Sequence, residues 1–165
     1  MKNQKNTVSV GISKLVATAF GAGYAPKAPG TAGALAATVF LYLFNTALVR
    51  YGATHMEVTI LDLLLLTVTF FAGVIAIKQV HEVWQHDAGK IVIDEVAGIF
   101  VTLLLSPPDW RYYLAGFILF RFFDIAKPLY IKRVDKLKTS WSVMLDDIIA
   151  GVYSFAVLQA ASLLL

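Results

Sequence analysis

The sequence predicts an all-α membrane protein, a polytopic helical bundle with about four to five membrane helices and a short N-terminal interfacial helix. Hydrophobic residues make up 58% of its 165 residues, and the mean hydropathy is +0.70. Both values lie outside the usual range for soluble domains. Long apolar stretches recur along the chain, and no repeat or linker divides it. We therefore expect residues 1–165 to form a single membrane-embedded domain.

The N-terminal segment predicts a helix that lies at the membrane interface. Within residues 8–20, apolar side chains recur at near-helical spacing, with Lys14 on the opposite side. Residues 21–30 are rich in glycine and proline, which predicts an irregular loop. Thr31 follows this loop and is expected to cap the first spanning helix.

Three apolar stretches are long enough to cross a membrane. They comprise residues 34–49, 60–77 and 148–165. At 1.5 Å per residue each reaches roughly 24 to 27 Å, close to the hydrocarbon thickness of about 30 Å. These three stretches predict spanning helices.

A fourth apolar region is divided into two shorter parts. Residues 96–105 and 112–123 are each only about 15 to 18 Å long as helices. Between them, Pro107 and Pro108 cannot continue a helix. We expect two shorter or partly buried helices here.

Basic residues predict the orientation. Only Arg50 and Arg111 fall in the connections that would lie outside. The other cations are Lys2, Lys5, Lys14, Lys27, Lys78, Lys90, Arg121, Lys127, Lys132, Arg133, Lys136 and Lys138. The positive-inside rule assigns their connections to the cytoplasm. Four aromatic side chains are read as interfacial anchors: Trp84, Trp110, Tyr112 and Tyr113.

Acidic residues occur at three places near the predicted cytoplasmic face. These are the pair Asp94 and Glu95, the single Asp124, and the pair Asp146 and Asp147. Ionisable groups in a membrane usually face the bundle interior and have a function there. Oxygen ligands from several helices at one depth suit Mg²⁺. The alternative is that the carboxylates only favour the positive ends of helix dipoles.

Arg121, Asp124 and Lys127 are spaced three residues apart, so neighbours can meet on one helix face. Two interpretations stay open. The three side chains form a structural ion-pair row, or the cations bind substrate phosphate while Asp124 holds metal.

The loop at residues 21–31 could place backbone N–H groups and Lys27 against a phosphate at a helix N-terminus. A simple turn that enters a membrane helix explains the same residues. The absence of cysteine excludes thiolate metal sites and a cysteine-nucleophile phosphatase.

Four segments, in this order, resemble motifs of the phosphatidylglycerophosphatase A family. They are residues 26–33 (PKAPGTAG), 86–98 (HDAGKIVIDEVAG), 120–128 (FRFFDIAKP) and 143–151 (VMLDDIIAG). The resemblance covers nearly the whole chain. Two departures are Tyr130, where the family commonly has proline, and residues 139–142, where it has a glycine-rich stretch. Fewer glycines make that stretch stiffer.

The resemblance implies a Mg²⁺-dependent lipid phosphatase. It would hydrolyse the phosphate monoester of phosphatidylglycerophosphate, giving phosphatidylglycerol, as a multi-pass protein of the bacterial plasma (inner) membrane. Its active site would face the cytoplasm, and its partners would be this phospholipid and the bilayer, with no nucleic acid.

We expect the following roles, each position being intact in this chain. The expected catalytic residues are Asp94, Glu95, Asp124, Asp146 and Asp147. The expected Mg²⁺ ligands are Asp94, Glu95, Asp124 and Asp147. The expected substrate-binding residues are Lys27, Pro29, Gly30, Thr31, Arg121 and Lys127.

Two other functions are alternatives to the phosphatase. A phosphatidyltransferase that acts on CDP-activated lipid would also use carboxylates and metal, but its pattern beginning Asp-Gly-x-x-Ala-Arg is absent. A small cation or metabolite carrier would need acidic groups spread across the membrane depth, whereas here they are expected to gather at one face.

Overall fold

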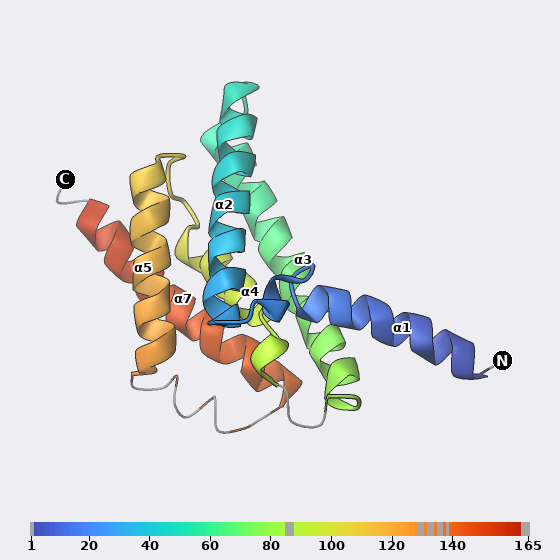
Figure 1. Cartoon of the computed structure of the whole chain (residues 1–165). Helices are drawn as coiled ribbons and strands as arrows, with labels where there is room; N and C mark the ends of the chain where they lie inside the picture. The colour runs from blue at the N-terminus through green and yellow to red at the C-terminus, as the bar shows by residue number, and fades with distance from the viewer. Residues whose placement is uncertain are drawn as a thin grey trace.

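A computed structural model gives the fold, and it describes residues 2–84, 88–128, 131, 134, 137 and 139–162 (Figure 1). The described residues form α-helices joined by turns, with no strand among them, which confirms the predicted all-α class. The α-helices are α1 (Lys2–Ala17), α2 (Pro29–Arg50), α3 (His55–His81), α4 (Ile93–Thr102), α5 (Trp110–Ala126) and α7 (Ser140–Ser162). Two 3-10 turns, η1 (Ala22–Tyr24) and η2 (Ala88–Lys90), connect them.

Three helices are long and apolar enough to cross a membrane. They are α2, α3 and α7. Helices α2 and α3 contain the predicted stretches 34–49 and 60–77, and α7 contains residues 148–162 of the third stretch, whose last three residues lie outside the described residues. The predicted pair of shorter helices is also present, as α4 and α5, with the break at the two prolines. A total of four to five membrane helices stays a prediction, because it depends on how deeply α4 and α5 enter the bilayer.

The start of α2 differs from the prediction. Thr31 does not cap this helix: Ala28 occupies the N-cap position, in a left-handed conformation with φ 48°, and Pro29 is in the first turn. Proline is favoured there because its fixed φ suits a helix and its missing N–H would be unpaired in any case. The proline therefore starts the helix before Thr31.

Helix α1 packs against the end of α3 and projects from the end of the bundle where α2 begins (Figure 1). The hydroxyls of Ser9 and Ser13 both donate to Gln79 Oε1, at 2.8 and 2.7 Å. On α1, Ile12 and Leu15 stay exposed. An exposed apolar strip suits a helix at the membrane surface, and this location remains a prediction.

Two glycines bring α4 and α7 together. A Cβ on Gly151 would lie 2.5 Å from the Gly98 carbonyl oxygen, and one on Gly98 would lie 2.8 Å from the Asp147 carbonyl oxygen. Larger residues would push the two helices apart. Gly98 follows Asp94 by four residues, and Gly151 follows Asp147 by four. Each carboxylate therefore lies one turn before the close contact, on the same helix face.

A polar cluster joins α2, α3 and α5 at the opposite end of the bundle. Asn45 Nδ2 donates hydrogen bonds to Asp62 Oδ2 and Tyr113 Oη, both at 3.0 Å. Tyr113 is buried, so its prediction as an interfacial anchor is wrong: its hydroxyl finds a partner inside the bundle. The acidic residues were expected to gather at one membrane face. Asp62 does not follow this expectation, because it lies at the opposite end of the bundle.

Candidate active site

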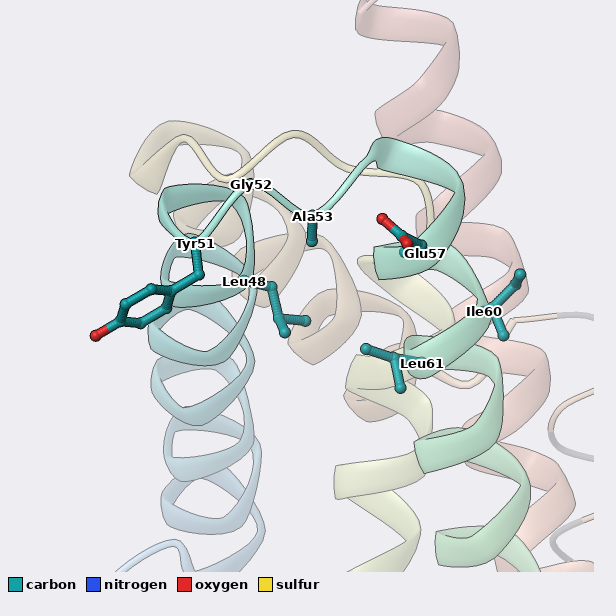
Figure 2. A pocket seen from close by; sticks show the side chains of 7 residues that line it. All are labelled: Leu48, Tyr51, Gly52, Ala53, Glu57, Ile60 and Leu61. Carbon is teal, nitrogen blue, oxygen red and sulfur yellow. The ribbon is translucent and has the colours of Figure 1, made fainter.

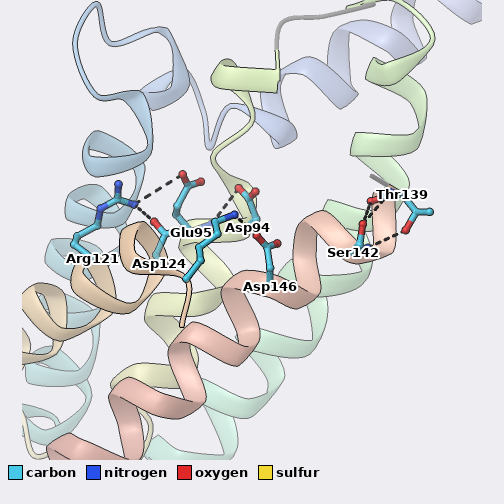
Figure 3. Close-up of polar contacts among 8 residues, drawn as sticks. Asp94, Glu95, Arg121, Asp124, Thr139, Ser142 and Asp146 are labelled. Carbon is cyan, nitrogen blue, oxygen red and sulfur yellow. Dashed lines mark hydrogen bonds and ion pairs between the residues drawn. The ribbon is translucent and has the colours of Figure 1, made fainter. Parts of the chain in front are cut away.

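Five acidic side chains converge where several helix ends meet, and Asp94, Glu95, Asp124 and Asp146 among them are labelled in Figure 3. Asp94 and Glu95 lie in the first turn of α4, and Asp124 lies near the end of α5. Asp146 and Asp147 lie early in α7, and both are buried. Glu95, Asp124 and Asp146 are close enough to Asp147 to act on it electrostatically. The three acidic places in the sequence thus form one cluster.

Three of these carboxylates are placed to share one cation. Asp94, Glu95 and Asp147 each offer an oxygen, and the three oxygens lie within 4.8 Å of one another. Glu95 Oε2 is buried without a hydrogen-bond partner. Like charges this close repel one another unless a cation or proton lies among them. A cluster made only of carboxylate oxygens suits a hard cation such as Mg²⁺.

Arg121 of α5 connects two of the acidic places. Its Nη1 atom lies 2.5 Å from Asp124 Oδ2 and 4.0 Å from Glu95 Oε1. Its Nε atom is buried and has no hydrogen-bond partner. Asp124 is therefore paired with an arginine and lies outside the three-carboxylate group, although it remains close to Asp147.

Lys127 turns away from the row of charges on α5. As the C-cap residue it has a left-handed conformation with φ 41°, and its N–H donates to the Phe123 carbonyl at 2.9 Å. Pro128 follows, and a residue before proline is disfavoured in the helical region. Lys127 Nζ contacts Asp146 Oδ2 of α7 at 2.6 Å. The row thus contains the Arg121–Asp124 pair, while Lys127 links α5 to α7.

The first turn of α2 borders the same cluster. A Cβ on Gly30 would overlap Glu95 Oε1 and would lie 3.4 Å from Arg121 Nη1. The N–H groups of Gly30 and Thr31 are in the first helical turn, where no intrahelical acceptor exists. Pro29 is beside them, and Lys27 is exposed in the preceding turn. Gly30 therefore brings the helix N-terminus against Glu95 and Arg121.

The segment that departs from the family pattern forms a helix cap. Thr139 N donates to Ser142 Oγ at 2.8 Å, and Ser142 N donates to Thr139 Oγ1 at 3.0 Å. Trp141 packs against Phe70 and Phe71 of α3. These contacts fix the start of α7, which carries the two aspartates. Tyr130 and the motif residues His86 and Asp87 lie outside the described residues.

The two glycines at the contact of α4 and α7 were not predicted to have a role. The available signal was their spacing, since Gly98 and Gly151 each follow an aspartate by one helical turn. Asp62, an acidic residue inside the predicted membrane span at residues 60–77, was also not predicted to have a role. Such a residue is rarely without a function.

Comparisons with known proteins agree on one family. A family model described as phosphatidylglycerophosphatase A matches residues 15–162. A Haemophilus influenzae protein named phosphatidylglycerophosphatase A is 37% identical, with 88% of this chain and 86% of that protein aligned. An Escherichia coli protein of the same name is 34% identical, over 87% of this chain and 80% of that protein.

A Bacteroides thetaiotaomicron protein, provisionally named as a phosphatidylinositol-3-phosphatase, is 38% identical over 89% of this chain and 91% of its own length. The comparison with solved structures finds no match.

Proposed function

The chain belongs to the phosphatidylglycerophosphatase A family, and we propose that it hydrolyses the phosphate monoester of phosphatidylglycerophosphate. The products are phosphatidylglycerol and inorganic phosphate, so one P–O bond to the lipid is broken and one to water is formed. The observation that best supports this chemistry is the group of three carboxylates beside Arg121 and the start of α2.

We propose that Asp94, Glu95 and Asp147 hold Mg²⁺. Three features support the fit: the ligand atoms are all carboxylate oxygens, they lie within 4.8 Å of one another, and one Glu95 oxygen lacks a partner. Bound Mg²⁺ would neutralise charge on the phosphate and favour an attacking water. Asp124 supports this group from beside Asp147 and orients Arg121.

The phosphate is proposed to bind between Arg121 and the first turn of α2. The guanidinium has an unpartnered Nε, and the Gly30 and Thr31 N–H groups have no acceptor within their helix. Helix N-termini and arginine both suit phosphate oxygens. Lys27, which is exposed before Pro29, would contact a headgroup that arrives from the membrane surface. Lys127 holds Asp146 and adds positive charge at the edge of the cluster.

Direct attack by water is the proposed reaction path. The chain has no Asp-x-Asp-x-Thr sequence of the kind that forms a phosphoaspartate in haloacid-dehalogenase enzymes. A carboxylate of the cluster accepts the proton that water loses, and the arginine stabilises charge on the phosphate oxygens. Phosphoryl transfer depends mainly on such positioning and charge stabilisation.

The proposed location is the bacterial plasma membrane, with several spans and the site at the cytoplasmic face. The helix ends that form the site lie on the side where basic residues are concentrated in the sequence. Because the chain has no cysteine, single cysteines can report topology. A cysteine at Lys90 should be labelled only from the cytoplasm and one at Thr54 only from outside. Labelling of both from the same side would contradict this arrangement.

Phosphate release by the purified protein tests the function. Phosphatidylglycerophosphate should be hydrolysed with Mg²⁺, and excess chelator should stop the reaction. Phosphatidylinositol 3-phosphate and soluble glycerol 3-phosphate, assayed in parallel, should be poorer substrates. Preference for the inositol lipid would change the assigned substrate, and full activity in chelator would contradict the metal site.

A further inference from the structure

The turn that ends α1 contains backbone strain. Ala19 and Phe20 both have left-handed conformations, with φ of 46° and 57°, and Gly21 follows with φ 103°. Residues other than glycine rarely take this conformation, and it persists only where surrounding contacts fix it. Thr18, which is fully buried, supplies such contacts. Its carbonyl oxygen accepts from the N–H groups of Gly21 and Gly23 at 3.1 and 3.0 Å, and its hydroxyl accepts from the Gly21 N–H at 3.2 Å.

This turn brings the N-terminal segment α1–η1, residues 2–24, against the residues that lead into α4. The Val92 N–H donates to the Ala17 carbonyl at 2.9 Å. A Cβ on Gly23 would overlap the Lys90 carbonyl oxygen, so only glycine fits here without a shift of the backbone. Val92 is fully buried and also packs on α2, where a Cβ on Gly33 would lie 2.7 Å from the Val92 Cβ. The start of α4 is thus held by the N-terminal segment and by α2.

The first turn of α4 depends on these contacts because it has no side-chain cap of its own. Val92 is the N-cap residue, and its side chain accepts no hydrogen bond. Asp94 and Glu95 are the second and third residues of the helix. A shift of the backbone at Val92 therefore moves both carboxylates. Groups in a functional site must be held to within about 0.5 Å of their working geometry by the contacts around them.

We propose that the α1–η1 segment positions Asp94 and Glu95 for metal binding, with Gly23 as the positioning residue at its contact with η2. This inference rests on the metal group proposed above. Mg²⁺ requires nearly octahedral oxygen ligands, so a displaced first turn of α4 would weaken its binding. The atoms nearest to a Cβ on Gly23 belong to Lys90 and Thr18, so Gly23 acts through the backbone and not by contact with the ion.

Calorimetric titration of the purified full-length chain with Mg²⁺, in the absence of substrate, tests the proposal. Gly23→Ala should bind Mg²⁺ about tenfold more weakly than the wild type, which is a usual effect for residues that orient metal ligands. Gly89→Ala is the matched control in η2, because nothing lies within 4 Å of its Cβ position, and it should bind Mg²⁺ like the wild type. Equal affinity in folded Gly23→Ala and Gly89→Ala would overturn the proposal.

Phosphate release gives a second readout, which a purely structural role would not change. In Gly23→Ala, the Mg²⁺ concentration needed for half-maximal turnover should rise, and saturating Mg²⁺ should restore most of kcat. Melting curves confirm that the variants are folded. A lower melting temperature with an unchanged Mg²⁺ requirement would show that Gly23 serves only stability, and would overturn the proposal.

A second pair of variants decides the question if Gly23→Ala does not fold. Thr18→Val removes the hydroxyl that accepts from Gly21, whereas Thr18→Ser keeps it. Thr18→Val should weaken Mg²⁺ binding, and Thr18→Ser should bind Mg²⁺ more tightly than Thr18→Val. Wild-type affinity in Thr18→Val would contradict the role of this turn.

Two further titrations distinguish a failure of this proposal from a failure of the proposed function. No Mg²⁺ binding by the wild type would remove the metal group and this inference together, whereas wild-type affinity in Gly23→Ala removes the inference alone. Glu57→Gln tests the opposite end of the bundle, where Glu57 lines a pocket of about 540 Å³ at the turn between α2 and α3 (Figure 2). This variant should bind Mg²⁺ like the wild type. A loss of affinity in Glu57→Gln would place the ion at that pocket and overturn the proposal.

Discussion

The two polar clusters of this membrane protein differ in how their charge is balanced. At one end, five carboxylates gather with Arg121 and Lys127 beside them, and Figure 3 labels Arg121 with the carboxylates of Asp94, Glu95, Asp124 and Asp146. At the other end, the single carboxylate of Asp62 accepts a hydrogen bond from the neutral amide of Asn45, and no ion pair recorded among the described residues includes Asp62. Many charges of both signs can hold a divalent ion together with phosphate, whereas one carboxylate can only be neutralised. The number and sign of the buried charges therefore distinguish the candidate active site from the cluster of Asn45, Asp62 and Tyr113.

The largest expected difference is in turnover. Asp94→Asn and Asp147→Asn should each lower kcat by at least about 100-fold, because an amide keeps the size but loses the charge that is proposed to hold Mg²⁺. Asp62→Asn should leave kcat within about twofold, since distant sites act independently. Phosphate release checks both, with melting curves to confirm folding. A loss of kcat in Asp62→Asn as large as that in Asp94→Asn and Asp147→Asn would contradict the functional difference between the two clusters.

Arg121 provides a sharper test of the phosphate site. Arg121→Lys keeps the charge but loses the forked donors, so kcat/KM should fall about 10- to 100-fold. The Asp124 pair survives in part, so the melting temperature should change little. Steady-state kinetics with phosphatidylglycerophosphate measure this. A lysine variant with normal kcat/KM would show that Arg121 serves only as the partner of Asp124.

The close contact of α4 and α7 should couple packing to chemistry. Gly151→Ala should lower stability by about 1 to 3 kcal/mol and also lower turnover, because the added methyl separates the two carboxylate-bearing helices. Gly11→Ala is the matched control, since nothing lies within 4 Å of its Cβ position. Denaturation and phosphate release are measured together. Loss of stability without loss of turnover would show that the contact of α4 with α7 does not position the carboxylates of the active site.

The smallest expected effect concerns the cap of α7. Thr139→Ala removes the acceptor for Ser142 N and should cost about 1 kcal/mol of stability. Turnover should change less than twofold if Trp141, packed on α3, still holds the helix in place. Chemical denaturation and the phosphate assay check the two parts. A large loss of turnover would make this cap a positioning element of the active site.

Much of this fold could be predicted because its signals are local. The three apolar stretches, the Pro107–Pro108 break and the order of the acidic motifs all follow from short segments of sequence. The start of α2 was missed because proline at the first turn outweighed the threonine further along.

The polar cluster at the far end was missed because its members come from three separate helices. Asn45, Asp62 and Tyr113 each look ordinary in sequence, and only packing brings them together. The pairing of Lys127 with Asp146 also depends on how α5 meets α7, which spacing along one helix does not reveal.

Binding of Mn²⁺, a paramagnetic ion that takes the same oxygen ligands as Mg²⁺, tests the central claim most directly. Loss of the free-ion EPR signal on titration with purified protein reports binding, and added Mg²⁺ should reverse it. The carboxylate group predicts that the wild type and Asp62→Asn bind Mn²⁺ alike, while Asp94→Asn binds it at least about tenfold more weakly. Equal Mn²⁺ affinity in folded Asp94→Asn and wild type would contradict a metal site at Asp94, Glu95 and Asp147.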